Sequence, residues 1–304
     1  MKLLPAFLLL FVNCFFTVVF AQPVVYTVAN AHSHNDYNQH SPYFQAYNEQ
    51  FGSMEADIHL RNGILIVGHD SDKLIVKNTL QALYLDPLVV SIAGNGGYVY
   101  KDSSRKLQLL IDIKTQPIST LNALVDLLKH YPAIIQNKTI KIVITGNRPD
   151  INLFKNYPSY IWFDGDANKT YSKQDLTKIA MLSEDFEEHS HWNGVGELPD
   201  SARIALTAMI SRAHSSHTPI RFYACPDVAT AWKVMEQLKV DFINTDHIEA
   251  LGDFLRRHND SLRLMPFNRI LHSAGEVIRF GNPDLENHAL DIASLNKDGK
   301  LLFI

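Results

Sequence analysis

Four short segments within the first 114 residues hold the side chains best suited to acid–base and metal chemistry. They supply two histidines, His34 and His69, and three carboxylates, Glu55, Asp57 and Asp112. Glu55 and Asp57 are two apart in a predicted strand, so their side chains share one face and can bind one cation. An all-carboxylate set favours Mg²⁺ or Ca²⁺, because Zn²⁺ prefers nitrogen or sulfur. Two histidines beside such an ion can remove one proton and deliver another near neutral pH.

The elements that must position these residues follow a repeating pattern. Helical patterns separate short apolar, β-rich runs, most clearly at Ser119–Lys129, Pro199–His214 and Asp227–Lys239, which is typical of a parallel α/β sheet. Eight runs occur: Val24–Ala31, Ser53–Ile58, Leu107–Ile113, Ile140–Thr145, Tyr160–Phe163, Ile179–Ser183, Ile220–Ala224 and Asp241–Asn244. This number predicts a closed, TIM-type (β/α)8 barrel. A doubly wound open sheet is the alternative, but no glycine-rich dinucleotide loop follows the first run.

The barrel brings the candidate residues to one end. Catalytic side chains in such barrels lie at the carboxyl ends of the strands. The turn Arg61-Asn62-Gly63 predicts a hairpin that returns through Ile64–Val67, which places His69 close to the end of the second strand. His32 precedes His34 by two residues on the same strand face and is the alternative for its role.

The order of these motifs resembles the signature of glycerophosphodiester phosphodiesterases. The motifs are His34, Glu55-x-Asp57, Asn62-Gly63 and His69-Asp70. They also resemble the wider superfamily that contains phosphatidylinositol-specific phospholipase C and sphingomyelinase D-type enzymes. The His-Asn-Asp-Tyr opening and the segment 79–88 are most similar to the branch related to altered inheritance of mitochondria protein 6. The similarity runs from about Val24 to about Leu255.

The resemblance implies a role for each candidate residue. His34 and His69 would act as acid and base, and Glu55, Asp57 and Asp112 would hold Mg²⁺ or Ca²⁺. Lys114 would lie beside the phosphate. Asn35, Tyr37 and Trp192 are the further candidates for substrate contact, although Trp192 could equally anchor a polar loop. The list of these candidates is His34, Asn35, Tyr37, Glu55, Asp57, His69, Asp112, Lys114 and Trp192.

The resemblance also implies a function. We expect a metal-dependent phosphodiesterase that hydrolyses glycerophosphodiesters or phospholipid headgroups, through a cyclic phosphate where a neighbouring hydroxyl attacks. Asn35-Asp36 stands where the commonest pattern has Arg-Gly, and Asp112 stands in an Asp-x-Lys motif closer to sphingomyelinase D-type sites. A catalytically silent barrel that serves as a binding or scaffold module is therefore the alternative. A glycosidase is disfavoured, because carboxylates two residues apart lie too close to flank a sugar.

The two ends of the chain differ from the barrel. Residues 1–21 have one early lysine, a long apolar run and small residues at the end, which predicts a signal peptide and a secreted or periplasmic protein without a membrane span after cleavage. The barrel is expected over 22–262. Residues 263–304 predict a β-rich extension that is either a docked hairpin or the start of a β-propeller.

The overall charge restricts the partners. The formal net charge is -4 and no long basic run occurs, which argues against nucleic acid as a ligand. A small phosphodiester or a phospholipid headgroup is the expected partner. After the predicted signal only Cys225 remains, so the mature chain cannot form an internal disulfide.

Overall fold

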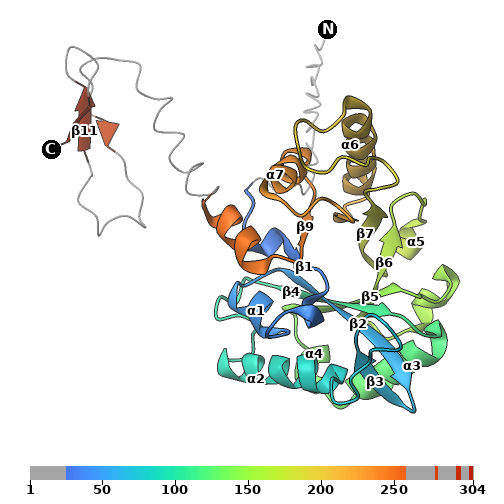
Figure 1. The fold of residues 1–304 in the computed structure, drawn as a ribbon. Coiled ribbons are helices and arrows are strands. Elements are labelled where there is room, and N and C mark those ends of the chain that lie inside the picture. Colours follow the sequence, from blue (N-terminus) through green and yellow to red (C-terminus); the bar gives the residue numbers. More distant parts are fainter. Residues whose placement is uncertain (1–24, 258–277, 280–291, 296–300, 304) are drawn as a thin grey trace, which may run out of the picture. The chain divides into compact units, whose positions relative to one another are not determined.

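The structure is a computed structural model, and it describes residues 25–257, 278–279, 292–295 and 301–303 (Figure 1). The chain divides into two compact units, Met1–Gly252 and Asp253–Ile304. Eight parallel strands of the first unit form one sheet: β1 (Ala31–Ser33), β2 (Ser53–Arg61), β4 (Leu107–Ile113), β5 (Ile140–Gly146), β6 (Ile161–Asp166), β7 (Ile179–Asp185), β8 (Ile220–Tyr223) and β9 (Phe242–Thr245). Because β1 pairs with both β2 and β9, the sheet closes on itself. The predicted TIM-type barrel is confirmed.

Helices connect most consecutive strands. The longer ones are α2 (Asp86–Gly94), α3 (Pro117–Leu128), α6 (Asp200–Ser215) and α7 (Ala229–Leu238). Shorter elements are η1 (Val28–Asn30), η2 (Asp36–Asn38), α1 (Phe44–Asn48), η3 (Gln81–Leu85), α4 (Pro132–Ile135), η4 (Ile151–Asn156) and α5 (Lys173–Leu176). The start of α3 has a clear local cause, because the Gln116 side chain accepts from the Ser119 amide and Pro117 needs no partner for a missing N–H.

The first strand differs from its prediction. The expected run Val24–Ala31 was wrong, because the strand begins only at Ala31 and the preceding Val28–Asn30 form a 3₁₀ turn. The Thr27 side chain accepts from the Ala29 amide, and the Asn30 side chain accepts from the Thr27 amide. These local bonds compete with strand pairing. As a result His34 follows the last residue of β1 directly, at the carboxyl end of the strand.

The hairpin after β2 forms as predicted. β3 (Ile64–Val67) runs antiparallel to the end of β2. Asn62 and Gly63 have φ values of 50° and 80°, the left-handed conformations that a two-residue hairpin loop requires. The Gly68 amide then donates to the Asp57 carbonyl at 3.1 Å, which returns the chain to the barrel end just before His69.

The second unit contains an antiparallel sheet of β10 (Ile278–Arg279), β11 (Ile292–Leu295) and β12 (Leu301–Phe303). The predicted signal peptide at 1–21 lies outside the described residues. Within the described part of the chain, none of the helices is both long and apolar enough to span a bilayer.

A buried carboxylate fixes the segment that carries His34. Asp36 has no exposed surface. Its carboxylate accepts from the Ser33 hydroxyl at 2.8 Å, the Tyr43 amide at 2.7 Å and the Tyr84 hydroxyl at 2.9 Å. Burial raises the pKa of Asp36, although these three donors oppose the rise. Asp36 of the His-Asn-Asp-Tyr motif is therefore a structural residue that joins the chain after β1 to η3.

Removing this carboxylate should therefore weaken the fold. We expect Asp36→Ala to lower the free energy of unfolding by about 3 kcal/mol, because three donors lose their buried acceptor. Tyr84→Phe, which deletes one donor, should cost about 1 kcal/mol. Urea unfolding followed by tryptophan fluorescence measures both. Asp126→Ala is the control, because the Asp126 side chain is 72% exposed; equal stability of the Asp36 and Asp126 variants would contradict the assignment.

Candidate active site

A polar cavity of about 670 Å³ opens where the carboxyl ends of the barrel strands meet, an end that we call the mouth. Its lining includes all of the predicted acid–base and metal residues: His34, Glu55, Asp57, His69 and Asp112. Asn35 and Lys114 line it as well. The structure thus brings together residues that lie between His34 and Lys114 in the sequence.

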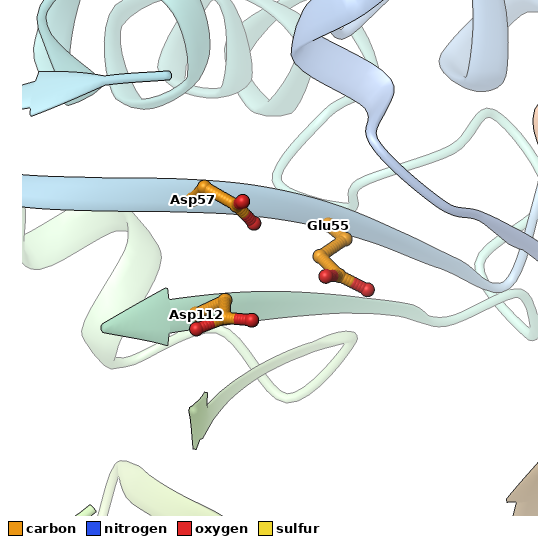
Figure 2. A group of neighbouring side chains, drawn as sticks. All are labelled: Glu55, Asp57 and Asp112. Carbon is orange, nitrogen blue, oxygen red and sulfur yellow. The ribbon is translucent and has the colours of Figure 1, made fainter. Parts of the chain in front are cut away.

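Three carboxylates of the cavity lining lie close together on neighbouring strands (Figure 2). Glu55 and Asp57 lie on β2, and Asp112 lies opposite Asp57 on β4. One oxygen from each carboxylate lies within 4.8 Å of the others. Glu55 is 4% and Asp57 is 1% exposed. So close a buried cluster of negative charge requires cations to compensate it.

Lys114 supplies part of this compensation. Its Nζ lies 3.0 Å from Asp57 Oδ2 and 2.9 Å from Asp112 Oδ2. Despite the cost of burial, the charges of Asp112 and Asp57 raise the pKa of Lys114, so it is cationic at neutral pH. Burial and the neighbouring Asp57 nevertheless raise the pKa of Asp112, so one lysine does not balance the cluster.

The remaining oxygens suit a metal ion. Asp57 Oδ1 and Asp112 Oδ1 are buried and accept no hydrogen bond from the described residues. Gly146, with φ of 68°, makes room for one of them, because a Cβ there would lie 1.8 Å from Asp112 Oδ1. Lys114 therefore binds one oxygen of each aspartate, and the other oxygen of each aspartate has no hydrogen-bond partner among the described residues. Two orphaned oxygens and Glu55 are a donor set that a hard divalent cation fits.

Glu55 belongs to a second buried network. Glu55 Oε2 lies 3.0 Å from His32 Nε2 and accepts from Arg221 Nη1 at 2.9 Å. The Ser53 hydroxyl lies 2.7 Å from His32 Nδ1. Burial and the Arg221 charge lower the pKa of His32 to about 4, so it is neutral at pH 7. Despite its burial, Glu55 has a pKa well below its usual range because of the His32 bond and Arg221. His32 therefore positions Glu55 and does not replace His34.

His34 follows β1 and is held by residues at the end of β9, the strand that pairs with β1 where the barrel closes. Its Nδ1 lies 3.0 Å from Asp246 Oδ1, and its amide donates to the Thr245 carbonyl. Asn35 Nδ2 lies 2.9 Å from the same Nδ1. Although burial opposes it, the bond to Asp246 and the charge of Glu55 raise the pKa of His34. With Nδ1 engaged by a carboxylate, Nε2 is the nitrogen that remains for a ligand.

His69 has a similar arrangement. Its Nδ1 lies 2.9 Å from Asp57 Oδ2, while the imidazole is 60% exposed. The Tyr37 hydroxyl lies 2.8 Å from the same Asp57 oxygen and 2.6 Å from Asn35 Oδ1. Tyr37 and Asn35 were predicted to contact substrate. In the structure they connect the hydrogen bonds around His69 with those around His34. Each histidine offers Nε2 and is held at Nδ1 by an aspartate.

Two predicted site residues do not line this cavity. Tyr37 lines a neighbouring cavity that shares Asn35 and His69 with it, and Trp192 lies outside both. Its indole N–H donates to the Val195 carbonyl at 2.9 Å. It lines a separate hollow beside His191 and Cys225. The loop-anchoring interpretation explains these contacts, because the bond closes a local turn within 192–195.

The cavity is also lined by charged residues that are not among the listed site candidates. Asp164 lies on β6, Glu184 on β7, and Arg148 follows β5. Asp164 is 2% exposed, and burial raises its pKa. Glu184 accepts from Asn168 Nδ2 at 2.6 Å and lies 2.9 Å from His189 Nε2. The sequence contained a signal for Asp164 and Glu184. Both directly follow an apolar run, where a charged residue is rarely buried without a partner.

Comparisons with known proteins agree with this arrangement. Residues 22–164 match the model of the AIM6-like phosphodiesterase domain family. The chain is 26% identical to altered inheritance of mitochondria protein 6 of Kluyveromyces lactis, over 75% of this chain and 72% of the relative. It is 24% identical to a homologue of that protein in Arthroderma benhamiae, over 72% of this chain and 81% of the relative.

Solved structures with a similar fold include a glycerophosphodiester phosphodiesterase from Parabacteroides distasonis. It has 14% sequence identity and a TM-score of 0.49, and the match covers 75% of this chain and 97% of that one. The resemblance found in the motifs is confirmed: residues 22–164 match the AIM6-like phosphodiesterase domain family, and about three quarters of the chain is similar to altered inheritance of mitochondria protein 6.

Proposed function

We propose that the protein is a secreted phosphoric diester hydrolase that requires Mg²⁺ or Ca²⁺ and cleaves glycerophosphodiesters or phospholipid headgroups. One observation carries the proposal: two imidazoles, each held at Nδ1 by an aspartate, line the same cavity as a buried three-carboxylate cluster with orphaned oxygens. Secretion rests on the signal-like segment 1–21 alone.

The residues divide the chemistry of phosphodiester cleavage between them. A bound divalent cation would supply Lewis acidity that offsets charge on a phosphoryl oxygen. Lys114 adds a fixed positive charge beside the carboxylates. One imidazole takes the proton of the attacking hydroxyl through Nε2, and the other gives a proton to the leaving oxygen. Where the substrate alcohol has a neighbouring hydroxyl, attack within the substrate forms a cyclic phosphate first.

The ligand atoms of the site favour Mg²⁺ or Ca²⁺ as the ion. Glu55, Asp57 and Asp112 offer only carboxylate oxygens. Mg²⁺ and Ca²⁺ take such ligands together with water and substrate oxygens. Glu55 and Asp57 also anchor neighbouring residues, because Glu55 contacts Arg221 and Asp57 contacts His69. Asp112 is therefore the ligand that can be replaced with least disturbance to the rest of the site.

A catalytically silent barrel is the second candidate. The observation in its favour is Asn35, whose neutral amide lies against His34 Nδ1 where the commonest phosphodiesterase pattern has an arginine. The positive charge beside the phosphate would then come from the cation and from Lys114, Arg148 and Arg221, which line the cavity. A silent barrel predicts cation binding without turnover of any phosphodiester.

Replacing either histidine should abolish turnover and leave the fold intact. We expect His34→Ala and His69→Ala each to lower kcat for bis(p-nitrophenyl) phosphate by at least about 10³-fold, because each removes one proton-transfer group. His130→Ala is the matched control, since His130 is exposed on the outside of the barrel near α4. Full activity in both site variants, or inactive wild-type protein, would refute the proposal.

The contact between Asp246 and His34 has a distinct kinetic signature. Asp246→Asn removes the charge that favours the imidazolium, so the pKa of His34 should fall and the limb of the kcat/KM profile that reports it should move to lower pH. We expect kcat to fall about 10- to 100-fold, because the imidazole also loses its orienting partner. Asp253→Asn, at an exposed ion pair, is the control. An unmoved pH profile would contradict this role.

Cation binding can be measured without activity. Saturating Ca²⁺ or Mg²⁺ should raise the Tm of wild-type protein by a few degrees, because the ion binds only the folded site. Asp112→Asn should lose this shift. Without the ion it should be at least as stable as wild type, because the pKa of Asp112 is raised and ionising this carboxylate costs folding energy. Differential scanning fluorimetry with and without chelator tests both statements; a retained shift would contradict the metal assignment.

A further inference from the structure

A loop beside His69 presents two aliphatic side chains to solvent. Residues 70–78 connect β3 to the segment before η3, and they include the sequence Lys-Leu-Ile-Val-Lys at 73–77. Ile75 is 53% and Val76 is 67% exposed. Single exposed aliphatic residues are ordinary on protein surfaces. An adjacent pair, flanked by lysines and one loop away from a candidate catalytic histidine, is a more specific arrangement.

The loop is held in place by its own bonds. The Val67 amide donates to the Asn78 carbonyl at 2.7 Å, and the Asn78 amide donates to the Ile75 carbonyl at 2.8 Å. The Lys73 amide donates to the Asp70 carbonyl at 3.1 Å. Leu74 turns inward, because its Cδ2 lies 2.9 Å from where a Gly68 Cβ would be. The fold therefore buries part of Leu74 and holds the next two side chains outward.

A second cavity connects this loop to the active site. It has a volume of about 600 Å³ and shares Asn35 and His69 with the first cavity. Val67, Ile75 and Leu83 add apolar surface to its lining. A phosphodiester has two ester arms. If the phosphate lies at the carboxylates, one arm lies in the first cavity and the other can extend into the second, whose lining combines polar residues such as Asn38 and Asn78 with these apolar ones and leads toward Ile75.

We propose that the loop 70–78 binds the surface of a zwitterionic phospholipid membrane by inserting Ile75 and Val76, which places the active-site mouth at the lipid–water interface. This inference rests on the proposed function and narrows its substrate to lipid phosphodiesters that are taken from a membrane. Lys73 and Lys77 lie on either side of the inserted pair, where their ammonium groups reach the phosphate level of the headgroups.

Size and charge favour this partner. Two side chains are too small for a stable protein interface, which buries about 800 Å² on each partner. They are sufficient for weak, reversible attachment to a membrane. The loop has Asp70 and Asp72 as well as its two lysines, so its formal charge is zero, and the whole chain has a formal charge of -4. Attraction to anionic lipid therefore does not drive membrane binding. The insertion of apolar side chains does.

The test compares two exposed valines. Full-length wild type, Val76→Asp and Val90→Asp are mixed with phosphatidylcholine vesicles, and the bound fraction is measured by flotation. Val90 lies on α2 and is 71% exposed, so it matches Val76 in residue type and exposure outside the loop. We expect Val76→Asp to lower the partition coefficient about 10-fold or more, and Val90→Asp to leave it unchanged.

Turnover separates this inference from the proposed function. Val76→Asp should cleave a soluble phosphodiester as wild type does, while its rate on a phosphodiester lipid in the same vesicles falls with binding. Wild-type protein that does not float with vesicles, equal loss in both variants, or binding that requires anionic lipid and disappears at high salt would each overturn the loop assignment. Inactivity on every soluble phosphodiester would refute the proposed function, whereas the flotation result needs no turnover.

Discussion

The buried negative charge of Glu55, Asp57 and Asp112 is the constraint on which the mouth depends. Three carboxylates within 4.8 Å of one another repel, and burial increases that cost. Cationic side chains in fixed positions offset part of this cost, because Lys114 contacts two of the carboxylates and Arg221 contacts the third. The balance is incomplete, because Asp57 Oδ1 and Asp112 Oδ1 have no partner among the described residues. This incomplete balance supports the divalent cation that we propose for the site.

The same constraint explains smaller features. Gly146 is required beside Asp112 because any side chain would occupy the space of Oδ1. His32 is neutral, because its burial and the neighbouring Arg221 charge lower its pKa. His69 and Tyr37 both use Asp57 Oδ2, so the carboxylate that positions the imidazole also belongs to the metal cluster. Loss of Asp57 would therefore disturb charge, orientation and cation binding together.

Local sequence signals predicted some of this arrangement well. β4 and β3 have the predicted bounds, because continuous apolar runs and an Asn-Gly turn are strong local signals. β1 was misplaced, because the bonds of Thr27 and Asn30 that form the 3₁₀ turn are not visible as periodicity. Glu55 and Asp57 were found from their types and their two-residue spacing on a strand, and Asp112 from its place near the end of the third predicted run. Arg221 and Asp246, which contact Glu55 and His34, were not predicted as partners.

Those partners lie far away in the chain. Arg221 contacts His32 across 189 positions, and Asp246 contacts His34 across 212. Within the segment 244–246, Thr245 accepts from the amide of the nearby His247, whereas Asp246 contacts the distant His34. Local signals report what a residue does for its own segment. They cannot report a contact that exists only once the barrel has closed.

Closure therefore has a chemical consequence. β9 pairs with β1 through Ser33 and Thr245, and the next residues on each side are His34 and Asp246. The last strand thus delivers the carboxylate that holds Nδ1 of the first histidine. A barrel with a loosened β1–β9 seam could retain the carboxylate cluster, which lies on β2 and β4 alone, and still lose the orientation of His34. In the proposed function, cation binding would depend on one pair of neighbouring strands, whereas acid–base chemistry would depend on the completed ring.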